Sequence, residues 1–171
     1  MANKALFLDR DGVINKEINY LHKIEDFEFI EGIFDLCRYF QEKGYLIIVV
    51  TNQSGIARGY YSHEQFDILT SWMTAEFAKN NIIVDKVYYC PHHPDISGVC
   101  ECRKPDIGMF IEAQKEFDID LKNSIMVGDN ERDIEAALKA GVESTYFFDE
   151  YNEVTDSKAV KIVHKLEEIY R

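Results

Sequence analysis

The segment 45–50 constrains the fold more than any other part of this chain of 171 residues. It reads Tyr-Leu-Ile-Ile-Val-Val, so every position is apolar. A strand with one face in water alternates apolar and polar residues, whereas a strand covered by helices on both faces is apolar throughout. The segment therefore predicts a buried strand of a parallel sheet and, with it, an α/β fold.

Strands and helices are predicted to alternate along the rest of the chain. Further strands are predicted at 4–8, 86–89, 124–127 and 144–148, and helices at 32–43, 63–80, 107–117, 132–140 and 158–170. Ser62 followed by Gln65 forms a capping box for the second helix, and Gly44 and Gly141 lie where helices commonly end. This order predicts a parallel sheet of about five strands with right-handed crossovers. The length is that of one domain, which we expect to span residues 1–171.

The charge of the chain limits its partners. Nineteen Lys and Arg residues against thirty-one Asp and Glu residues leave a formal net charge of −12. Such a field repels nucleic acid and anionic membrane surfaces, so neither is expected as a partner. Any phosphate site must therefore contain local cations or a metal ion.

The hydropathy pattern indicates where the protein is located. No apolar stretch approaches the roughly 18 residues that a membrane helix needs, and the N-terminus lacks the architecture of a signal peptide. We therefore expect a cytoplasmic protein, in which disulfide bonds are rare.

Two carboxylates, Asp9 and Asp11, follow directly on the first predicted strand. Alternation along a strand would point both to the same side. Two like charges close together are stable only if a cation binds there or one acid keeps its proton. Gly12 would let the backbone turn sharply or let a ligand approach it closely. Taken alone, the motif is equally typical of a polar turn.

Three more polar motifs are predicted at the same edge of the sheet. Thr51-Asn52-Gln53-Ser54-Gly55 follows the second strand, Gly128-Asp129 with Asp133 follows the fourth, and Arg103-Lys104-Pro105 precedes a helix. Ligands of open α/β sheets bind at the carboxyl ends of the strands. Together the motifs supply metal carboxylates, hydroxyl and amide donors, and a cation.

A cysteine–histidine loop, residues 90–103, contains a second constellation. Its candidate zinc ligands form a tetrahedral Cys₃His set: Cys90, His92, Cys100 and Cys102. His93 competes with His92 as the ligand, and free thiols are also often simply buried. Cys37 lies among apolar residues of the first helix and is expected in the core. A zinc ion here would be structural.

The four polar motifs, in this order, resemble those of the haloacid-dehalogenase-like (HAD) phosphatases, which have a Rossmann-like sheet. The matching residues are Asp9-Arg10-Asp11, Thr51, Lys104, and Gly128-Asp129 with Asp133. The resemblance implies that Asp9 is the nucleophile and forms an aspartyl-phosphate. It implies that Asp11 is the general acid and base.

The same resemblance implies a metal and a phosphate clamp. Mg²⁺ would be held by Asp9, Asp129 and the backbone carbonyl of Asp11. Thr51 and Lys104 would bind the phosphoryl oxygens. Asp133 would order Lys104 or the water shell of the metal, or it is an exposed acid in a first helical turn.

The cysteine–histidine loop and the segments 7–12, 27–30, 50–59 and 88–94 resemble the D-glycero-D-manno-heptose 1,7-bisphosphate phosphatases most closely. This resemblance implies hydrolysis of the C7 phosphate, leaving the 1-phosphate, in the biosynthesis of nucleotide-activated heptose for lipopolysaccharide. The alternatives are a histidinol-phosphate phosphatase, whose family shares the loop, and a broader small-molecule phosphatase. A zinc-stabilised binding module without activity is disfavoured by the charge and by the complete catalytic set.

The intervals between the motifs indicate an open site. Superfamily members with a cap domain insert it between the first and second motifs or between the second and third. Neither interval here has room for a cap, so we expect a capless enzyme and a monomer. Substrate contacts are expected from Glu17, Asn19, Tyr20, Asn52, Gln53, Ser54 and Arg103. The guanidinium of Arg103 would hold a second phosphate or the hydroxyls as a rigid fork.

Overall fold

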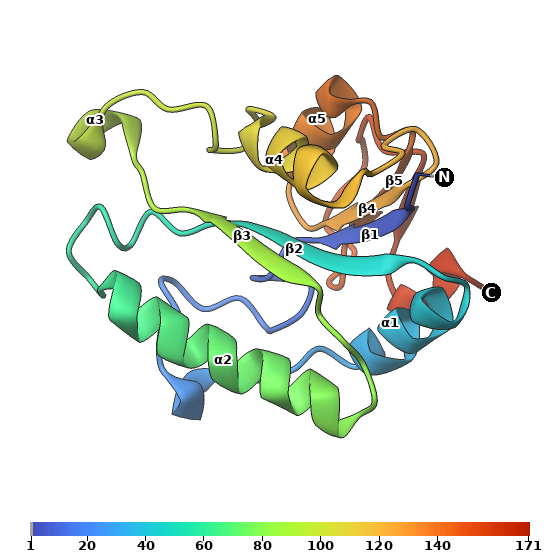
Figure 1. The fold of residues 1–171 in the computed structure, drawn as a ribbon, viewed down its shortest axis with the longest axis horizontal. Coiled ribbons are helices and arrows are strands. Elements are labelled where there is room, and N and C mark those ends of the chain that lie inside the picture. Colours follow the sequence, from blue (N-terminus) through green and yellow to red (C-terminus); the bar gives the residue numbers. More distant parts are fainter. Residues whose placement is uncertain (1) are drawn as a thin grey trace.

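The computed structural model describes residues 2–171 and contains one six-stranded sheet in the order β3-β2-β1-β4-β5-β6 (Figure 1). All the neighbouring strands are parallel. The strands are β1 (Ala5–Leu8), β2 (Leu46–Asn52), β3 (Lys86–Cys90), β4 (Ile125–Gly128), β5 (Ser144–Phe148) and β6 (Lys161–Val163). The predicted parallel α/β fold is therefore confirmed.

Helices cover both faces of the sheet, with α1 and α2 on one side and α4 and α5 on the other (Figure 1). Their bounds are α1 (Ile33–Glu42), α2 (His63–Lys79), α3 (Pro94–Ser97), α4 (Gly108–Phe117) and α5 (Glu131–Ala140). Two 3₁₀ turns, η1 (Ile24–Asp26) and η2 (Leu166–Ile169), complete the elements. The Ser62–Gln65 capping box is present at α2, and Gly141 ends α5 with a φ of 108°. No helix within residues 2–171 is long and apolar enough to cross a membrane.

The apolar run of β2 supplies side chains to two cores. Ile47 and Val49 belong to the cluster that includes residues of α1 and α2, while Ile48 and Val50 belong to the cluster of α4 and α5. All four are fully buried. Successive side chains of a strand point to opposite faces, so a strand between two helical layers needs apolar residues at every position.

The prediction of a helix at 158–170 was wrong. The sheet has six strands, where about five were predicted. Lys161–Val163 instead pairs in parallel with β5, with Val163 opposite Phe148. The segment contains Val160, Ile162 and Val163, which are β-branched and favour strands. In so short an apolar segment, periodicity does not separate strand from helix, and the open edge of β5 decides the outcome.

Replacing Phe77 of α2 tests the core on the α1–α2 face. Phe77 is fully buried, and its ring lies 5.0 Å from that of Phe34 and 5.8 Å from that of Phe29, centre to centre. Phe77→Ala is expected to lower the free energy of unfolding by about 3–5 kcal/mol, because it leaves a cavity. The measurement is urea denaturation. Ile68→Ala, at an exposed position of the same helix, should change stability by less than about 0.5 kcal/mol.

Candidate active site

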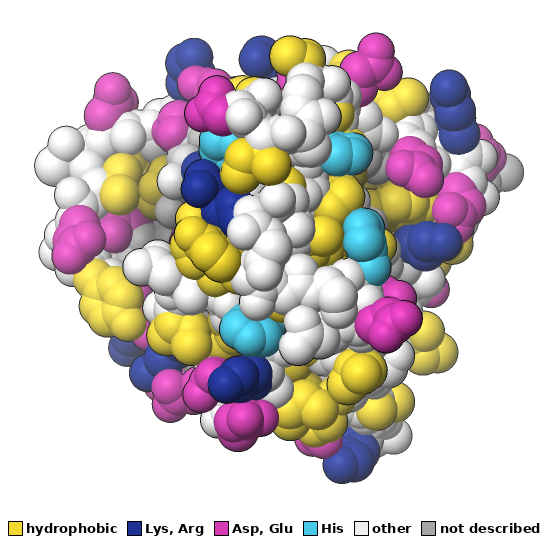
Figure 2. Space-filling view, turned by 90° about the vertical axis from the view of Figure 1, so that its left-hand side faces the viewer, with side chains coloured by type: hydrophobic (Ala, Val, Ile, Leu, Met, Phe, Trp, Pro, Cys, Tyr) yellow, Lys and Arg dark blue, Asp and Glu magenta, His cyan; other side chains and the backbone are white. Residues whose placement is uncertain are grey.

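The loops at the carboxyl ends of β1, β2 and β4, together with the cysteine–histidine loop, line one pocket of about 350 Å³. Figure 2 views the molecule from the side on which the loops after β2 and β3 lie. Lys and Arg side chains lie next to hydrophobic side chains within that face. The pocket is lined by residues of all four polar motifs, which are spread over residues 9–133 of the sequence.

The ammonium group of Lys104 lies at the centre of this pocket. Its Nζ is 3.0 Å from Asp9 Oδ1 and 2.7 Å from Asp133 Oδ1, and it donates to the Val50 carbonyl at 2.8 Å. Burial alone would lower the pKa of Lys104, but the carboxylates of Asp133 and Asp9 outweigh it and raise the pKa above its ordinary value. Lys104 therefore stays charged although its side chain is only 1% exposed.

Asp133 is buried beside Lys104 and is not an exposed acid of a helical turn. Its Oδ2 also accepts a hydrogen bond from the backbone N–H of Asn130, at 3.2 Å, and closes the capping box of α5. This geometry matches the expectation that Asp133 orders Lys104. Because the helix start and the ion pair use the same carboxylate, α5 and Lys104 are fixed relative to each other.

Asp9, Asp129 and Asp133 form an acidic cluster in which one oxygen from each lies within 4.8 Å of the others. Burial raises the pKa of Asp9 to about 6, with the charge of Asp133 adding to the rise. Burial and the neighbouring Asp9 raise the pKa of Asp129 to about 9. Clustered carboxylate oxygens with unfavourable mutual charge are the donor set that a hard divalent cation such as Mg²⁺ prefers.

Gly12 allows this cluster to form. Its φ is +90°, and a Cβ at this position would lie 1.8 Å from Asp129 Oδ2. Any side chain would therefore displace Asp129 as well as strain the turn. The structure shows the sharp turn expected of this glycine, and the protein group that lies close to it is the Asp129 carboxylate.

Asp11 is held by hydrogen bonds on both carboxylate oxygens. Its Oδ1 accepts from Arg10 at 2.8 Å and from Asn15 at 3.1 Å, and its Oδ2 accepts from Gln53 at 3.1 Å. Tyr61 in turn donates to Gln53 Oε1. No sequence pattern indicated the supports from Asn15 and Tyr61, because they depend on how the two loops fold over each other.

Thr51 and Asn52 lie at the end of β2, and of the two only Asn52 lines the pocket. Thr51 is fully buried, and its hydroxyl accepts a hydrogen bond from Gln53 at 2.9 Å. The carboxamide of Asn52 bonds the backbone of Lys104 at both ends, donating to its carbonyl at 3.1 Å and accepting from its N–H at 3.0 Å. The structure thus uses the Asn52 side chain to hold Lys104, although Asn52 also lines the pocket.

The four candidate zinc ligands converge in the cysteine–histidine loop. The Sγ atoms of Cys90 and Cys100, and those of Cys100 and Cys102, are 3.6 Å apart, and His92 Nδ1 lies 3.6 Å from Cys90 Sγ and 3.3 Å from Cys102 Sγ. A tetrahedral zinc with Zn–S bonds of about 2.3 Å places its sulfur ligands about 3.8 Å apart. Only Cys90 and Cys102, at 2.6 Å, are markedly closer than that. The donor set fits a zinc ion.

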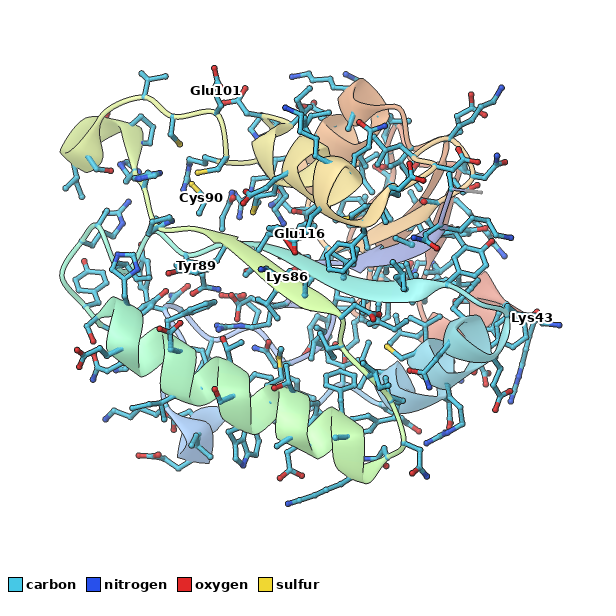
Figure 3. The ribbon with its side chains drawn as sticks, viewed as in Figure 1. Lys43, Lys86, Tyr89, Cys90, Glu101 and Glu116 are labelled. Carbon is cyan, nitrogen blue, oxygen red and sulfur yellow. The ribbon has the colours of Figure 1, made fainter. Side chains whose placement is uncertain are left out.

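His93 and Tyr89, which adjoin the candidate zinc ligands in the sequence, make other contacts. His93 uses its Nδ1 to accept from the backbone N–H of Asp95 at the start of α3. Tyr89 and Cys90 (both labelled in Figure 3) are consecutive in β3 and point to opposite sides of the sheet, since Tyr89 packs on Phe66 of α2 and Cys90 joins the cluster. Cys37 is buried in the α1–α2 core, as expected.

The remaining predicted substrate contacts also line the pocket: Glu17, Asn19, Tyr20, Gln53, Ser54 and Arg103. Burial raises the pKa of Glu17 to about 7, with Asp11 and Asp9 adding to the rise. Three further lining residues, Arg58, Tyr61 and Arg132, were missed. The available signal was their position within or directly after the polar motifs that follow β2 and β4.

Comparisons with known proteins agree with this arrangement. A family model described as HAD-hydrolase-like matches residues 101–160. D-glycero-alpha-D-manno-heptose-1,7-bisphosphate 7-phosphatase of Campylobacter jejuni is 57% identical over 142 residues, which are 83% of this chain and 80% of that protein. The corresponding beta-anomer phosphatase of Yersinia pestis is 49% identical over 143 residues, 81% of this chain and 76% of that protein.

A solved structure extends the match to the fold. D,D-heptose 1,7-bisphosphate phosphatase from B. bronchiseptica, complexed with magnesium and phosphate, has a TM-score of 0.84 at 27% identity, over 95% of this chain and 93% of that chain. The parallel sheet and the Asp–Lys pocket are therefore those of a HAD-like phosphatase. Within that class, the chain belongs to the D-glycero-D-manno-heptose-1,7-bisphosphate 7-phosphatase family.

The raised pKa of Asp129 predicts how stability depends on pH in protein stripped of metal with EDTA. The pKa rises from 3.8 to about 9 on folding, so between these values the folded state binds the proton more tightly than the unfolded state. Stability from this group therefore falls as pH rises from about 4 to about 9. Asp129→Asn removes this loss, so the variant should melt at an increasingly higher temperature than the parent as pH rises.

Thermal melts from pH 4 to pH 9 in EDTA measure this difference. Added Mg²⁺ should stabilise the parent protein and should leave Asp129→Asn nearly unchanged, because a metal that binds only the folded state raises its stability. A parent protein that gains stability relative to the variant as pH rises, without metal, would contradict the burial of an acid at this position.

Proposed function

We propose that this chain hydrolyses the C7 phosphate of D-glycero-D-manno-heptose 1,7-bisphosphate and releases the heptose 1-phosphate. The observation that carries the proposal is the buried Lys104, ion-paired with Asp9 and Asp133 in a pocket that also contains Asp129. The identity to heptose bisphosphate phosphatases supports the substrate. The relatives act on different anomers, so the anomer used here is a matter for measurement.

In the proposed reaction, Asp9 attacks phosphorus and the bond to the sugar oxygen breaks. Asp11 gives its proton to the leaving oxygen, then takes a proton from the water that hydrolyses the aspartyl-phosphate. Lys104, 3.0 Å from Asp9 Oδ1, favours the ionised carboxylate that attack requires. The hydrogen bonds from Arg10, Asn15 and Gln53 hold Asp11 in one orientation.

Charge neutralisation supplies the rest of the catalysis. Thr51 and Lys104 would bind the phosphoryl oxygens. Asp9, Asp129 and the backbone carbonyl of Asp11 would hold Mg²⁺, which when bound neutralises charge on the phosphoryl group. The raised pKa values of Asp9 and Asp129 support this assignment, because a cation would relieve the repulsion that causes part of the rise.

The cysteine–histidine loop has a structural role in this proposal. Cys100 and Cys102 directly precede Arg103 and Lys104, so zinc at the Cys₃His set would immobilise both cations. We further propose that the chain acts as a cytoplasmic monomer of one domain. Its charge of −12 disfavours nucleic acid and anionic membranes as partners.

Asp9→Asn tests the nucleophile. The variant should lose phosphate release by several orders of magnitude, because an amide oxygen is a far weaker nucleophile than a carboxylate. Initial rates on both anomers of the heptose bisphosphate and on histidinol phosphate measure activity and substrate choice together. Asp67→Asn, at an exposed position of α2, is the matched control. Retained turnover in Asp9→Asn would remove Asp9 from its role, and faster turnover of histidinol phosphate would remove the proposed substrate.

Cys102→Ser tests the zinc loop. Structural zinc contributes about 10–16 kcal/mol of binding free energy in small peptides, so its loss should loosen residues 90–103 and lower kcat/KM by about tenfold or more. Zinc content, measured by mass spectrometry, and protease cleavage within the loop follow the change. Cys37→Ala is the control and should keep its zinc. Full activity in zinc-free protein with an intact loop would contradict the proposal.

A further inference from the structure

Three of the six arginines of the chain, Arg58, Arg103 and Arg132, line the pocket. The other three, Arg10, Arg38 and Arg171, each pair with a carboxylate at 2.8–3.0 Å. Within residues 2–171, no carboxylate oxygen lies within 4.0 Å of the guanidinium nitrogens of Arg58, Arg103 or Arg132, although the protein carries thirty-one acids. We call these three residues the arginine rim.

The rim comes from three separate segments of the chain and lines the same pocket as the acidic cluster. Arg58 follows β2, Arg103 precedes Lys104 in the cysteine–histidine loop, and Arg132 lies in the first turn of α5 after β4. Since β2 and β4 lie on either side of β1 in the sheet, Arg58 and Arg132 approach the pocket from opposite sides of Asp9. An anion bound between them would lie beside the acidic cluster.

Arg58 has hydrogen-bonding capacity that the protein leaves unused. Its Nε is buried and has no partner among the described residues. The guanidinium carbon lies 5.7 Å from the ring centre of Tyr20, and Tyr20 packs edge-on against Tyr60 at 4.7 Å. These aromatic contacts hold the guanidinium at the pocket wall, so an anion that reaches it meets a preorganised donor.

Arg132 is fixed through its backbone. Its N–H donates to the side chain of Asn130 at 3.1 Å, within the capping box of α5. The preceding residue, Glu131, accepts from the Ser157 hydroxyl and from the Lys158 N–H, both at 2.9 Å. The segment after β5 thus holds the start of α5 in place, and with it the backbone of Arg132. Its charge faces Glu17 across the pocket and opposes the rise of the Glu17 pKa.

We propose that Arg58 and Arg132 join Arg103 to bind the second, non-reacting phosphate of the substrate, so that the arginine rim sets a preference for bisphosphates over monophosphates. This inference rests on the proposed function. The reacting phosphoryl group is assigned to Lys104 and Thr51 at the acidic cluster, which leaves for another anion three guanidinium groups without a carboxylate partner among the described residues, of which Arg103 donates to the His92 carbonyl at 3.4 Å. Guanidinium forks match the oxygens of a phosphate and form charge-assisted hydrogen bonds to it.

The test compares a bisphosphate with the matching monophosphate. For the parent protein, Arg58→Gln and Arg132→Gln, kcat and KM are measured on heptose 1,7-bisphosphate and heptose 7-phosphate, and on fructose 1,6-bisphosphate and fructose 6-phosphate. Each substitution should lower the bisphosphate-to-monophosphate ratio of kcat/KM by about tenfold, mainly through KM, because it removes hydrogen bonds to a charged group. Arg58→Lys and Arg132→Lys should recover part of the ratio.

Two further variants separate binding from structure. Arg171→Gln removes an arginine far from the pocket and should leave the ratio unchanged. Ser157→Ala removes one support of Glu131 and should lower the ratio less than Arg132→Gln does. Ratios that stay at the parental value in both Arg→Gln variants, or equal losses on the bisphosphate and the monophosphate, would overturn the inference.

The two sugar pairs keep the inference distinct from the proposed function. If the parent protein does not prefer the heptose substrate but the arginine variants still lower the fructose ratio, the proposed function fails and the inference stands. If the parent protein prefers the heptose bisphosphate and the variants keep that preference, the proposed function stands and the inference fails.

Discussion

The ion pair network of Lys104 with Asp9 and Asp133 is the interaction on which the rest of the site depends. A buried lysine between two buried carboxylates is stable only as a set, since breaking such a pair commonly costs about 3–5 kcal/mol. With Asp9 and Asp133 both ionised the set has one negative charge more than positive, and burial beside Asp9 raises the pKa of the adjacent Asp129 to about 9, so that this carboxyl keeps its proton at neutral pH unless a cation binds. A divalent cation bound as proposed above would balance the acids, and a phosphoryl group would balance the lysine.

The rest of the architecture serves to hold this network in position. Asp133 is fixed by the helix cap of α5, Lys104 by the Asn52 carboxamide and the Val50 carbonyl, and Asp9 by its place directly after β1. These supports come from β1, β2 and the start of α5 after β4, so the network forms only when these elements have come together. The sheet and its loops thus align Asp9, Lys104 and Asp133, which are far apart in sequence.

The sequence predicted those parts of the structure that local patterns determine. The apolar run at 45–50 and the capping box at Ser62 each have one physical solution, and the structure shows it. The C-terminal segment has no such pattern, because its fold depends on the free edge of β5. For Tyr61, Arg58 and Arg132 the sequence offered only their position near the polar motifs, since their place in the pocket depends on which loops meet and on which arginines lack an acid.

The two hydrogen bonds between the Asn52 side chain and the Lys104 backbone extend the hydrogen-bonding pattern of the sheet. One donor and one acceptor of a carboxamide engage the N–H and C=O of the same residue, which is the pattern by which a peptide unit pairs with a neighbouring strand. The side chain thereby imitates one more rung of β-ladder past the last residues of β2 and β3. The irregular loop that contains the candidate zinc ligands is thus hydrogen-bonded to the end of β2 at Lys104, the residue whose ammonium group pairs with Asp9 and Asp133.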